Sequence, residues 1–360
     1  MNNLRIGDSG DVVNEVITSL NRIGLLESKP TNFDASVKAA VSAFQQRRGL
    51  TVTGEVNQET FNALEEARWK LGDRSLYLTP SPLLRGDDVA ALQSRLTEMG
   101  FDCGRVDGIF GSVTEKAVKE FQKSVGADVD GKCGPETFTA LIRLQRSVSG
   151  GAPAQLRETV KQMNRGPALA GKVVVLDPYD DLSYDIAART EGRLLALGAS
   201  VFLTRGPQNN PIESDRIKLA NSSGADLMIS LGFDKYQNEK AHGVATFYYG
   251  AVTHGVHSIV GERFASLVQR EICARTDLQN NRTHVKTWDI LRLTQCPTVR
   301  IDLGYESNQG DVERYSRAEF RDLIAESLVI AIQRLYLAAE DDAKTGTLRI
   351  SDLKRAGLRL

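Results

Sequence analysis

The chain has 360 residues, and because ordinary domains contain about 100 to 200 residues, we expect two or three domains. Hydrophobic residues make up 41% of the chain, charged residues make up 25%, and the formal net charge is -1. This composition is typical of a globular protein and excludes a disordered or fibrous chain. The balanced charge also argues against a nucleic-acid-binding protein, which would need a basic excess.

The N-terminus lacks a basic segment followed by an apolar one, so it is not a secretory signal, and no run of about 18 apolar residues would cross a membrane. We therefore expect a cytoplasmic protein. Its four cysteines are sparse and have no C-x-x-C spacing, which in a reducing compartment argues against disulfides and against a thiolate zinc site. Free thiols are expected at Cys103, Cys133, Cys273 and Cys296.

The first 145 residues contain an internal repeat. Residues 40–45 (AVSAFQ) recur as residues 117–122 (AVKEFQ), an offset of 77 positions (117 minus 40). Each copy opens with apolar residues at helical spacing and a glycine suited to a helix stop: Val13, Val16, Leu20, Ile23 and Gly24 in the first copy, and Val89, Leu92, Leu96, Met99 and Gly100 in the second. Two further helices are predicted in each copy, near Phe44 and Thr60 and near Phe121 and Thr137.

These three-helix units resemble the peptidoglycan-binding domain found beside many cell-wall hydrolases, and we place them at residues 1–72 and 73–147. The second copy matches better because it contains V-D-G-I-F-G at 106–111, a loop that borders the family's ligand groove. The resemblance implies ligand contacts by Val106, Asp107, Gly108 and Phe110. The alternative is a glycine-supported turn that only holds the second helix. In the first copy residues 28–34 replace this loop, so no ligand binding is implied there.

Residues 148–170 contain Gly-Gly-Ala-Pro and Gly-Pro and predict a linker with one short helix at 155–163. The apolar runs at 173–176, 201–203 and 227–229 are typical of buried parallel strands. A helix is predicted at 185–197, further strands at 244–249 and 298–303, and a long helix at 317–338. Strands alternating with helices indicate an α/β domain with a mainly parallel sheet at 171–338, followed by a tail at 339–360.

Residues 172–337 resemble the zinc-dependent N-acetylmuramoyl-L-alanine amidases of type 3. The resemblance is carried by five segments in the family's order: VVVLDP at 173–178, LTR at 203–205, RIKLAN to GADLMISL over 216–231, HGVATFYY at 242–249 and PTVRIDLGYESN at 297–308.

Working members of that family bind zinc through a histidine at the position of Asp180, a glutamate about a dozen residues later and a histidine at the position of Gly232. Here both histidines are absent, the loop for the glutamate is shortened, and the glutamate that assists the attacking water corresponds to Asp302. A hydrolytic zinc site needs about three protein ligands to lower the pKa of its water. The resemblance therefore implies vestigial positions, no catalytic residue, no metal and no cofactor.

The histidines and two adjacent aspartates are further candidate metal ligands. His254 and His257 are three residues apart and could share a helix face, but ordinary polar histidines are the preferred interpretation, as for His242 and His284. Asp180 and Asp181 could bind a hard cation, but a solvated turn or a helix cap is preferred.

Three functions remain open at this stage. The order of the domains resembles a family of cytoplasmic actinobacterial regulators that bind and activate MurA, the enolpyruvyl transferase that commits UDP-N-acetylglucosamine to peptidoglycan synthesis. We favour this regulatory pseudoenzyme because a cytoplasmic protein has no cross-linked wall to cut, and its recruitment to the inner face of the membrane is a further expectation. The alternatives are an amidase with an atypical site and a protein that binds muropeptides or lipid-linked precursors.

The tail contains Thr345 and Thr347 between an acidic run and a basic one. The same resemblance implies that a membrane serine/threonine kinase phosphorylates threonine in this tail. A phosphate adds about -1.5 to -2 charge, which an arginine cluster of the transferase or a phosphothreonine-binding domain would recognise. The alternative is a frayed terminus.

Overall fold

A computed structural model of the chain describes residues 3–144, 168–236, 238–251 and 256–337. The chain divides into two compact units, which are treated separately below: the first holds residues 1–156, and the second holds most of the remainder. Among the described residues, no helix is both long enough and apolar enough to span a membrane. The predicted linker lies largely outside the described residues and the tail lies wholly outside them, and the domain boundaries remain predictions.

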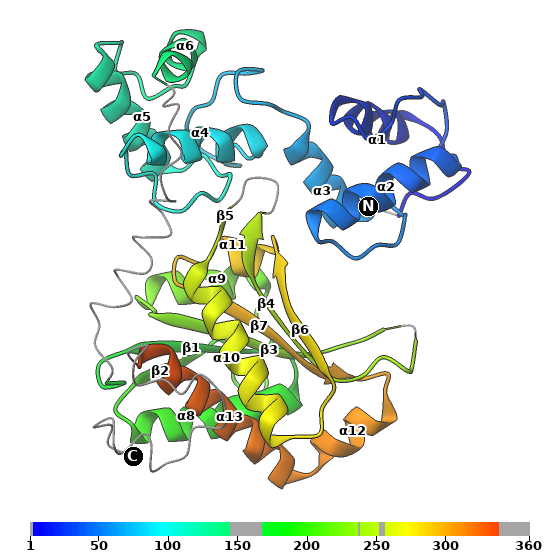
Figure 1. The fold of residues 1–360 in the computed structure, drawn as a ribbon, viewed down its shortest axis with the longest axis vertical. Helices are drawn as coiled ribbons and strands as arrows, with labels where there is room; N and C mark the ends of the chain where they lie inside the picture. The colour runs from blue at the N-terminus through cyan, green and yellow to red at the C-terminus, as the bar shows by residue number, and fades with distance from the viewer. Residues whose placement is uncertain (1–2, 145–167, 237, 252–255, 338–360) are drawn as a thin grey trace. The chain divides into compact units, whose positions relative to one another are not determined.

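Unit 1 consists of two three-helix repeats, as predicted (Figure 1). The first contains α1 (Asp11–Arg22), α2 (Ala35–Arg48) and α3 (Gln58–Ala67), and the second contains α4 (Asp87–Glu98), α5 (Ser112–Val125) and α6 (Pro135–Arg143). Gly24 and Gly100 follow α1 and α4 with φ values of 74° and 95°, which is the left-handed conformation expected of a glycine after a helix. Each repeat has its own apolar core.

A buried glutamine in each repeat explains why the second helix keeps the A-V-x-x-F-Q pattern. Oε1 of Gln45 accepts hydrogen bonds from the backbone N–H groups of Thr53 and Gly54, and Oε1 of Gln122 accepts one from Gly131. Each glutamine therefore fixes the turn that leads into the third helix, because a buried amide is stable only when its donors and acceptor are bonded.

Unit 2 is built on a sheet with the order β2-β1-β3-β7-β4-β5, and β6 also pairs with β4. The strands are β1 (Val173–Pro178), β2 (Ser200–Leu203), β3 (Leu227–Asp234), β4 (Val244–Ala251), β5 (Val256–His257), β6 (Asn280–Lys286) and β7 (Thr298–Tyr305). The pairs β1–β2, β1–β3, β3–β7 and β4–β6 are parallel, and β4 runs antiparallel to β7. The prediction of an α/β domain with a mainly parallel sheet is confirmed.

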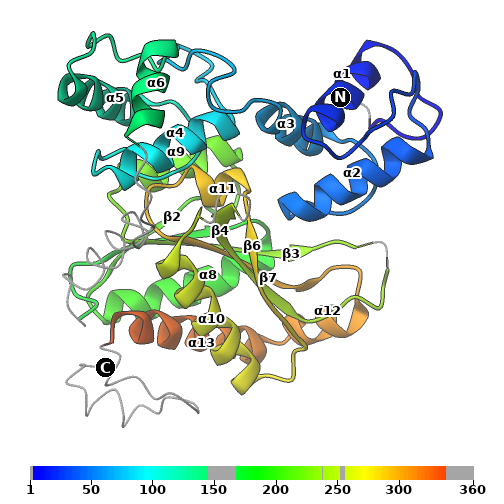
Figure 2. The same cartoon turned by 45° about the horizontal axis from the view of Figure 1, so that its top comes forward.

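Three long helices cover one face of this sheet: α8 (Asp181–Ala196), α10 (Ile259–Arg275) and α13 (Ala318–Tyr336) (Figures 1 and 2). The shorter helices α9 (Glu213–Ser222) and α11 (Asp289–Arg292) lie on the other face, and α12 (Gln309–Ser316) leads into α13 (Figure 2). The main core lies between the sheet and the three long helices.

Several sequence-based expectations for unit 2 need correction. The run at 201–203 is not a buried strand, because β2 is the edge of the sheet and Phe202 is 44% exposed. The helix expected from residue 185 begins at Asp181, four residues earlier. His257 lies in strand β5 rather than on a helix, and His254 lies outside the described residues. Strand β6 and helix α10 were not predicted, and the four cysteines form no disulfide in the structure.

Candidate functional site

The carboxyl end of β1 runs almost directly into α8. Only Tyr179 and Asp180 separate the strand from the helix, so no loop exists there that could carry a glutamate ligand. Oδ1 of Asp180 accepts a hydrogen bond from the N–H of Ser183 at 2.7 Å and caps α8, while Oδ2 accepts one from the N–H of Phe233 in β3 at 3.2 Å. Both carboxylate oxygens of Asp180 therefore serve the fold, as the helix-cap interpretation predicted.

The side chain of Tyr179 lies against Gly232 at the end of β3. A Cβ atom added to Gly232 would lie 3.1 Å from Cβ of Tyr179, which is closer than ordinary van der Waals contact. The guanidinium carbons of Arg216 and Arg300 lie 4.5 Å and 4.7 Å from the centre of the Tyr179 ring. Burial, reinforced by the charge of Asp177, raises the pKa of Tyr179 to about 12, so its hydroxyl stays protonated. The space beside Gly232 is thus filled by a neutral ring between two cations.

Asp302 pairs in register with Gly232 and is 6% exposed. Its Oδ1 accepts a hydrogen bond from Nε of Arg300 at 2.8 Å. Burial raises the pKa of Asp302, and the charge of Arg300 opposes that rise. The carboxylate that corresponds to the family's general base is therefore paired with an arginine two residues before it in the same strand.

Asp177 and Arg216 form a second buried pair beside the first. Nη1 of Arg216 lies 3.1 Å from Oδ1 of Asp177, and the hydroxyl of Thr204 donates to the same oxygen at 2.5 Å. Asp177 is fully buried and Arg216 nearly so. These contacts tie β1 to α9 and orient the guanidinium that lies over Tyr179.

An aromatic cluster continues from Arg300 across β4 and β6. The guanidinium carbon of Arg300 lies 5.3 Å from the ring centre of Trp288, and the Trp288 and Phe247 rings lie 4.8 Å apart. Phe247 stacks on His284 at 5.6 Å, and the Lys286 ammonium lies 5.3 Å from the Trp288 ring. All of these side chains except the exposed His284 are half-buried. Tyr179, Arg300, Trp288 and Phe247 thus lie next to one another as three rings and one guanidinium.

The structure brings Asp180, Gly232 and Asp302 to one end of the sheet, and their vestigial role stays a prediction. Sequence reasoning missed Arg300 and Trp288. The available signal for Arg300 was its place two residues before Asp302 in the largely apolar run Thr298–Tyr305, because a charge in a buried strand needs a partner. In the part of the chain that the structure describes, no three His, Cys, Asp or Glu side chains are arranged to hold a metal ion.

The V-D-G-I-F-G turn of the second repeat is held by Gln93 of α4. Its Nε2 donates to Oδ1 of Asp107, the carbonyl of Ile109 and the hydroxyl of Thr114, and its Oε1 accepts from the N–H groups of Asp107 and Gly108. Val106 and Phe110 are buried in the repeat's core, and Gly108 has a φ of 73°. These four predicted binding residues have structural contacts, and their contact with a ligand stays a prediction.

The first repeat has no such glutamine. Gln93 is the seventh residue of α4, and the seventh residue of α1 is Ile17, which is buried in the core of its repeat. An isoleucine cannot bond the backbone of a turn, so the loop at 28–34 takes another course, with Phe33 bonded to Gly7 and Asp8. This single difference accounts for the loss of the motif in the first copy.

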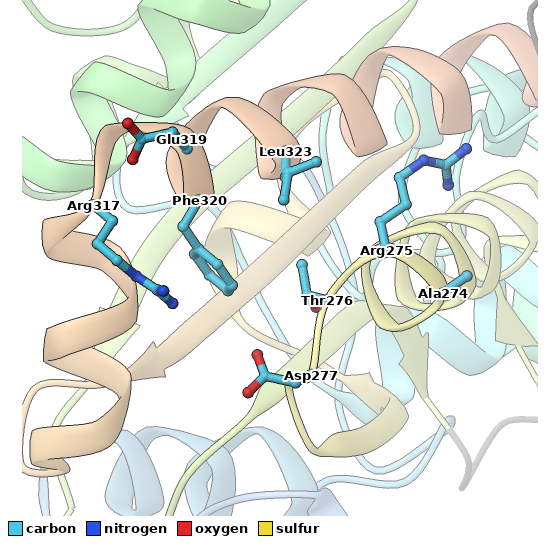
Figure 3. Close-up of a pocket in the computed structure, with 8 residues that line it drawn as sticks. All are labelled: Ala274, Arg275, Thr276, Asp277, Arg317, Glu319, Phe320 and Leu323. Atoms are coloured by element: carbon cyan, nitrogen blue, oxygen red, sulfur yellow. The ribbon is translucent and has the colours of Figure 1, made fainter.

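A cavity of about 500 Å³ lies elsewhere in unit 2, between the end of α10 and the start of α13 (Figure 3). Phe320 and Leu323 form an apolar wall, and the carboxylate of Asp277 faces them. Nη2 of Arg314 lies 2.9 Å from Oδ2 of Asp277 and neutralises it. No vestigial position lines this cavity.

Comparison with known proteins agrees with this architecture. Residues 179–334 match the family model of N-acetylmuramoyl-L-alanine amidases, and residues 9–64 and 85–141 match the model of putative peptidoglycan-binding domains. These matches define a protein in which two peptidoglycan-binding domains precede an amidase domain. The chain belongs to this amidase family.

Two relatives illustrate the extent of the similarity. The protein named N-acetylmuramoyl-L-alanine amidase CwlM of Mycobacterium tuberculosis is 40% identical over 380 aligned positions, which cover 97% of this chain and 93% of that protein. The germination-specific amidase of Bacillus subtilis is 26% identical over 48% of this chain and 83% of its own length. Among solved structures, the amidase Ami1 of Mycobacterium smegmatis aligns with a TM-score of 0.41 and 20% identity, covering 47% of this chain and 98% of its own.

Proposed function

We propose that this chain is a regulatory pseudoenzyme that has kept the amidase fold without the zinc chemistry. The observation that carries the proposal is the filling of the former metal position: Tyr179 occupies the space beside Gly232, and Arg300 neutralises Asp302. A side chain at position 232 would place its Cβ atom 3.1 Å from Cβ of Tyr179, and Asp180 is already bonded at both oxygens. Without a ligand set, no protein-bound water becomes acidic enough to attack an amide.

The partner in this proposal is the enolpyruvyl transferase MurA, which the chain binds and activates in the cytoplasm. Support comes from the resemblance of the domain order to actinobacterial regulators and from the 40% identity to CwlM over 97% of the chain. Phosphorylation of Thr345 or Thr347 by a serine/threonine kinase would control the interaction. Both threonines lie outside the described residues.

The test measures transfer of the enolpyruvyl group to UDP-N-acetylglucosamine by purified MurA, with and without kinase-treated protein. We expect stimulation that disappears when residues 340–360 are deleted or when Thr345 and Thr347 are both changed to alanine. Asp302→Asn, if the variant is folded, should leave stimulation largely unchanged, because the carboxylate has no catalytic role in the proposal. Unchanged stimulation after the deletion would remove the tail from the mechanism.

A second candidate is an amidase with an atypical site, which is favoured by the match to the amidase family and by the name of the CwlM relative. Release of free stem peptide from muramyl peptide by the purified chain would support it. A third candidate, binding of muropeptides or lipid-linked precursors, is favoured by the two peptidoglycan-binding domains.

The regulatory proposal also includes a protein with a phosphothreonine-binding domain that recognises the phosphorylated tail. Such a protein would be recovered together with the kinase-treated chain, but not with the untreated chain.

A further inference from the structure

The guanidinium of Arg300 lies close to two aromatic rings and is bonded along one edge. Its carbon lies 4.7 Å from the ring centre of Tyr179 and 5.3 Å from that of Trp288, and its Nε donates to Asp302 at 2.8 Å. Burial works against the charged form, but the charge and hydrogen bond of Asp302 together with other nearby acidic groups, including Asp234, outweigh it, and the pKa of Arg300 is raised. The guanidinium is therefore charged and held in one orientation before any ligand arrives.

The remaining N–H donors of the Arg300 guanidinium are those on its two terminal nitrogens. No acceptor among the described residues takes a hydrogen bond from either terminal nitrogen of Arg300, although the pairing with Asp302 leaves four N–H groups there. The side chain is 21% exposed, so a ligand can reach it. A planar pair of terminal nitrogens matches the two oxygens of a carboxylate or phosphate, and a fixed orientation lowers the entropic cost of binding.

We propose that Arg300 and Trp288 form a binding site for a ligand that carries one carboxylate or phosphate group beside a ring. The oxyanion would bind the terminal nitrogens of Arg300. The ring would pack on the half-buried Trp288 and Phe247 side chains, which lie beside Arg300 and offer apolar faces. This site deepens the proposed function, on which it rests, because Arg300 is bonded to Asp302, the residue that corresponds to the family's general base.

The charged groups around Arg300 determine how much negative charge a bound ligand can carry. The carboxylate of Asp302 is already paired with Arg300, and Lys286 adds a second cation next to Trp288. Asp234 and Glu213 also act on Arg300, and burial together with the charge of Asp289 raises the pKa of Glu213. This balance accommodates a ligand with one oxyanion group and disfavours a ligand with several.

Trp288 gives the test a built-in reporter, because the chain has only two tryptophans and Trp69→Phe leaves Trp288 alone. The full-length Trp69→Phe protein is titrated with N-acetylmuramic acid, which supplies a carboxylate, with N-acetylglucosamine 1-phosphate, which supplies a phosphate, and with neutral N-acetylglucosamine. We expect a saturable change in Trp288 fluorescence with at least one charged sugar and no saturable change with the neutral one.

Arg300→Gln should weaken that binding about 10- to 100-fold, as expected for the loss of charge-assisted hydrogen bonds. Arg317→Gln, which removes an exposed arginine at the N-cap of α13 in the same unit, should leave it unchanged. Calorimetry on the unmodified chain replaces fluorescence if Trp69→Phe is unfolded, and Arg300→Lys replaces Arg300→Gln for the same reason.

Failure of both charged sugars to saturate would overturn the site, and so would equal binding by the neutral sugar or by the Arg300 variant. The proposed function has a separate readout, since stimulation of MurA is measured without these sugars. A chain that stimulates MurA but binds neither charged sugar would refute the site and leave the regulatory role standing.

Discussion

Two regions of the molecule differ in whether they keep the motif of their family. One is the turn at 106–111 in the second repeat, and the other is the end of the sheet in unit 2. The turn keeps its motif, yet its residues are bonded to Gln93 or buried in the core. The sheet end has lost its motif, and the space is filled by Tyr179 and Arg300 instead. An intact motif therefore does not establish ligand binding, and a lost motif does not leave an empty pocket.

Removing Arg300 should have the largest effect on this comparison. Arg300→Leu leaves Asp302 buried without its partner, and we expect it to lower the free energy of unfolding at pH 7 by about 3 kcal/mol in urea denaturation. The double variant Arg300→Leu/Asp302→Leu should recover most of that loss because no charge remains buried.

The cost of Arg300→Leu should depend on pH in a defined direction. Burial raises the pKa of Asp302, and without Arg300 nothing nearby in the same strand opposes that rise. A raised folded pKa gives stability that is present at low pH and lost as the pH rises through it. The difference in the free energy of unfolding between the parent and Arg300→Leu should therefore shrink as the pH falls. A difference that grew on acidification would contradict this assignment.

Gln93→Ala is the matching change in the second repeat. It leaves two buried N–H groups of the turn and the hydroxyl of Thr114 without their partner, which should cost about 2 kcal/mol of unfolding free energy. Ser94→Ala on the same helix is the control and should be nearly neutral. If Gln93→Ala were also neutral, the turn would not depend on Gln93, and a ligand role for Asp107 and Gly108 would gain weight.

Gly232→Ala tests whether Tyr179 truly fills the former ligand position. The added methyl would meet Cβ of Tyr179 at 3.1 Å, so we expect a loss of about 1 kcal/mol from overpacking. In a Tyr179→Gly background the same change should cost clearly less, because the Cβ atom that the added methyl meets is gone. Equal costs in both backgrounds, measured by thermal unfolding, would show that the two residues do not compete for space.

The smallest expected effect concerns the surface ion pairs between α8 and α13. Hydrogen bonds from Arg193 and Arg189 lower the pKa of Asp322, whose side chain is 45% exposed. A lowered folded pKa gives stability that is present near neutral pH and lost as the pH falls through it. Asp322→Asn should cost less than about 1 kcal/mol at pH 7, and nothing once the parent carboxylate is protonated at about pH 2.

The repeats and the sheet class were predictable because they depend on periodic apolar patterns that local sequence shows directly. The edge position of β2 was not, since the run Val201–Leu203 resembles a buried strand and only the pairing order exposes Phe202. For the candidate site, the sequence analysis named Asp180, Gly232 and Asp302 because the family's metal-binding and catalytic side chains are absent there, and their loss of function stays a prediction. Its replacements were missed because Tyr179, Trp288 and Arg300 come from three distant segments that only the fold brings together.

The central claim is that this amidase fold holds no catalytic zinc, and the zinc content of the protein tests it most directly. The full-length chain is purified from cells grown with added zinc, passed through a mild chelator and measured by elemental analysis. We predict far less than one zinc per chain, because Asp180 is bonded within the fold, Gly232 has no side chain and Arg300 neutralises Asp302. One tightly held zinc per chain would contradict the account.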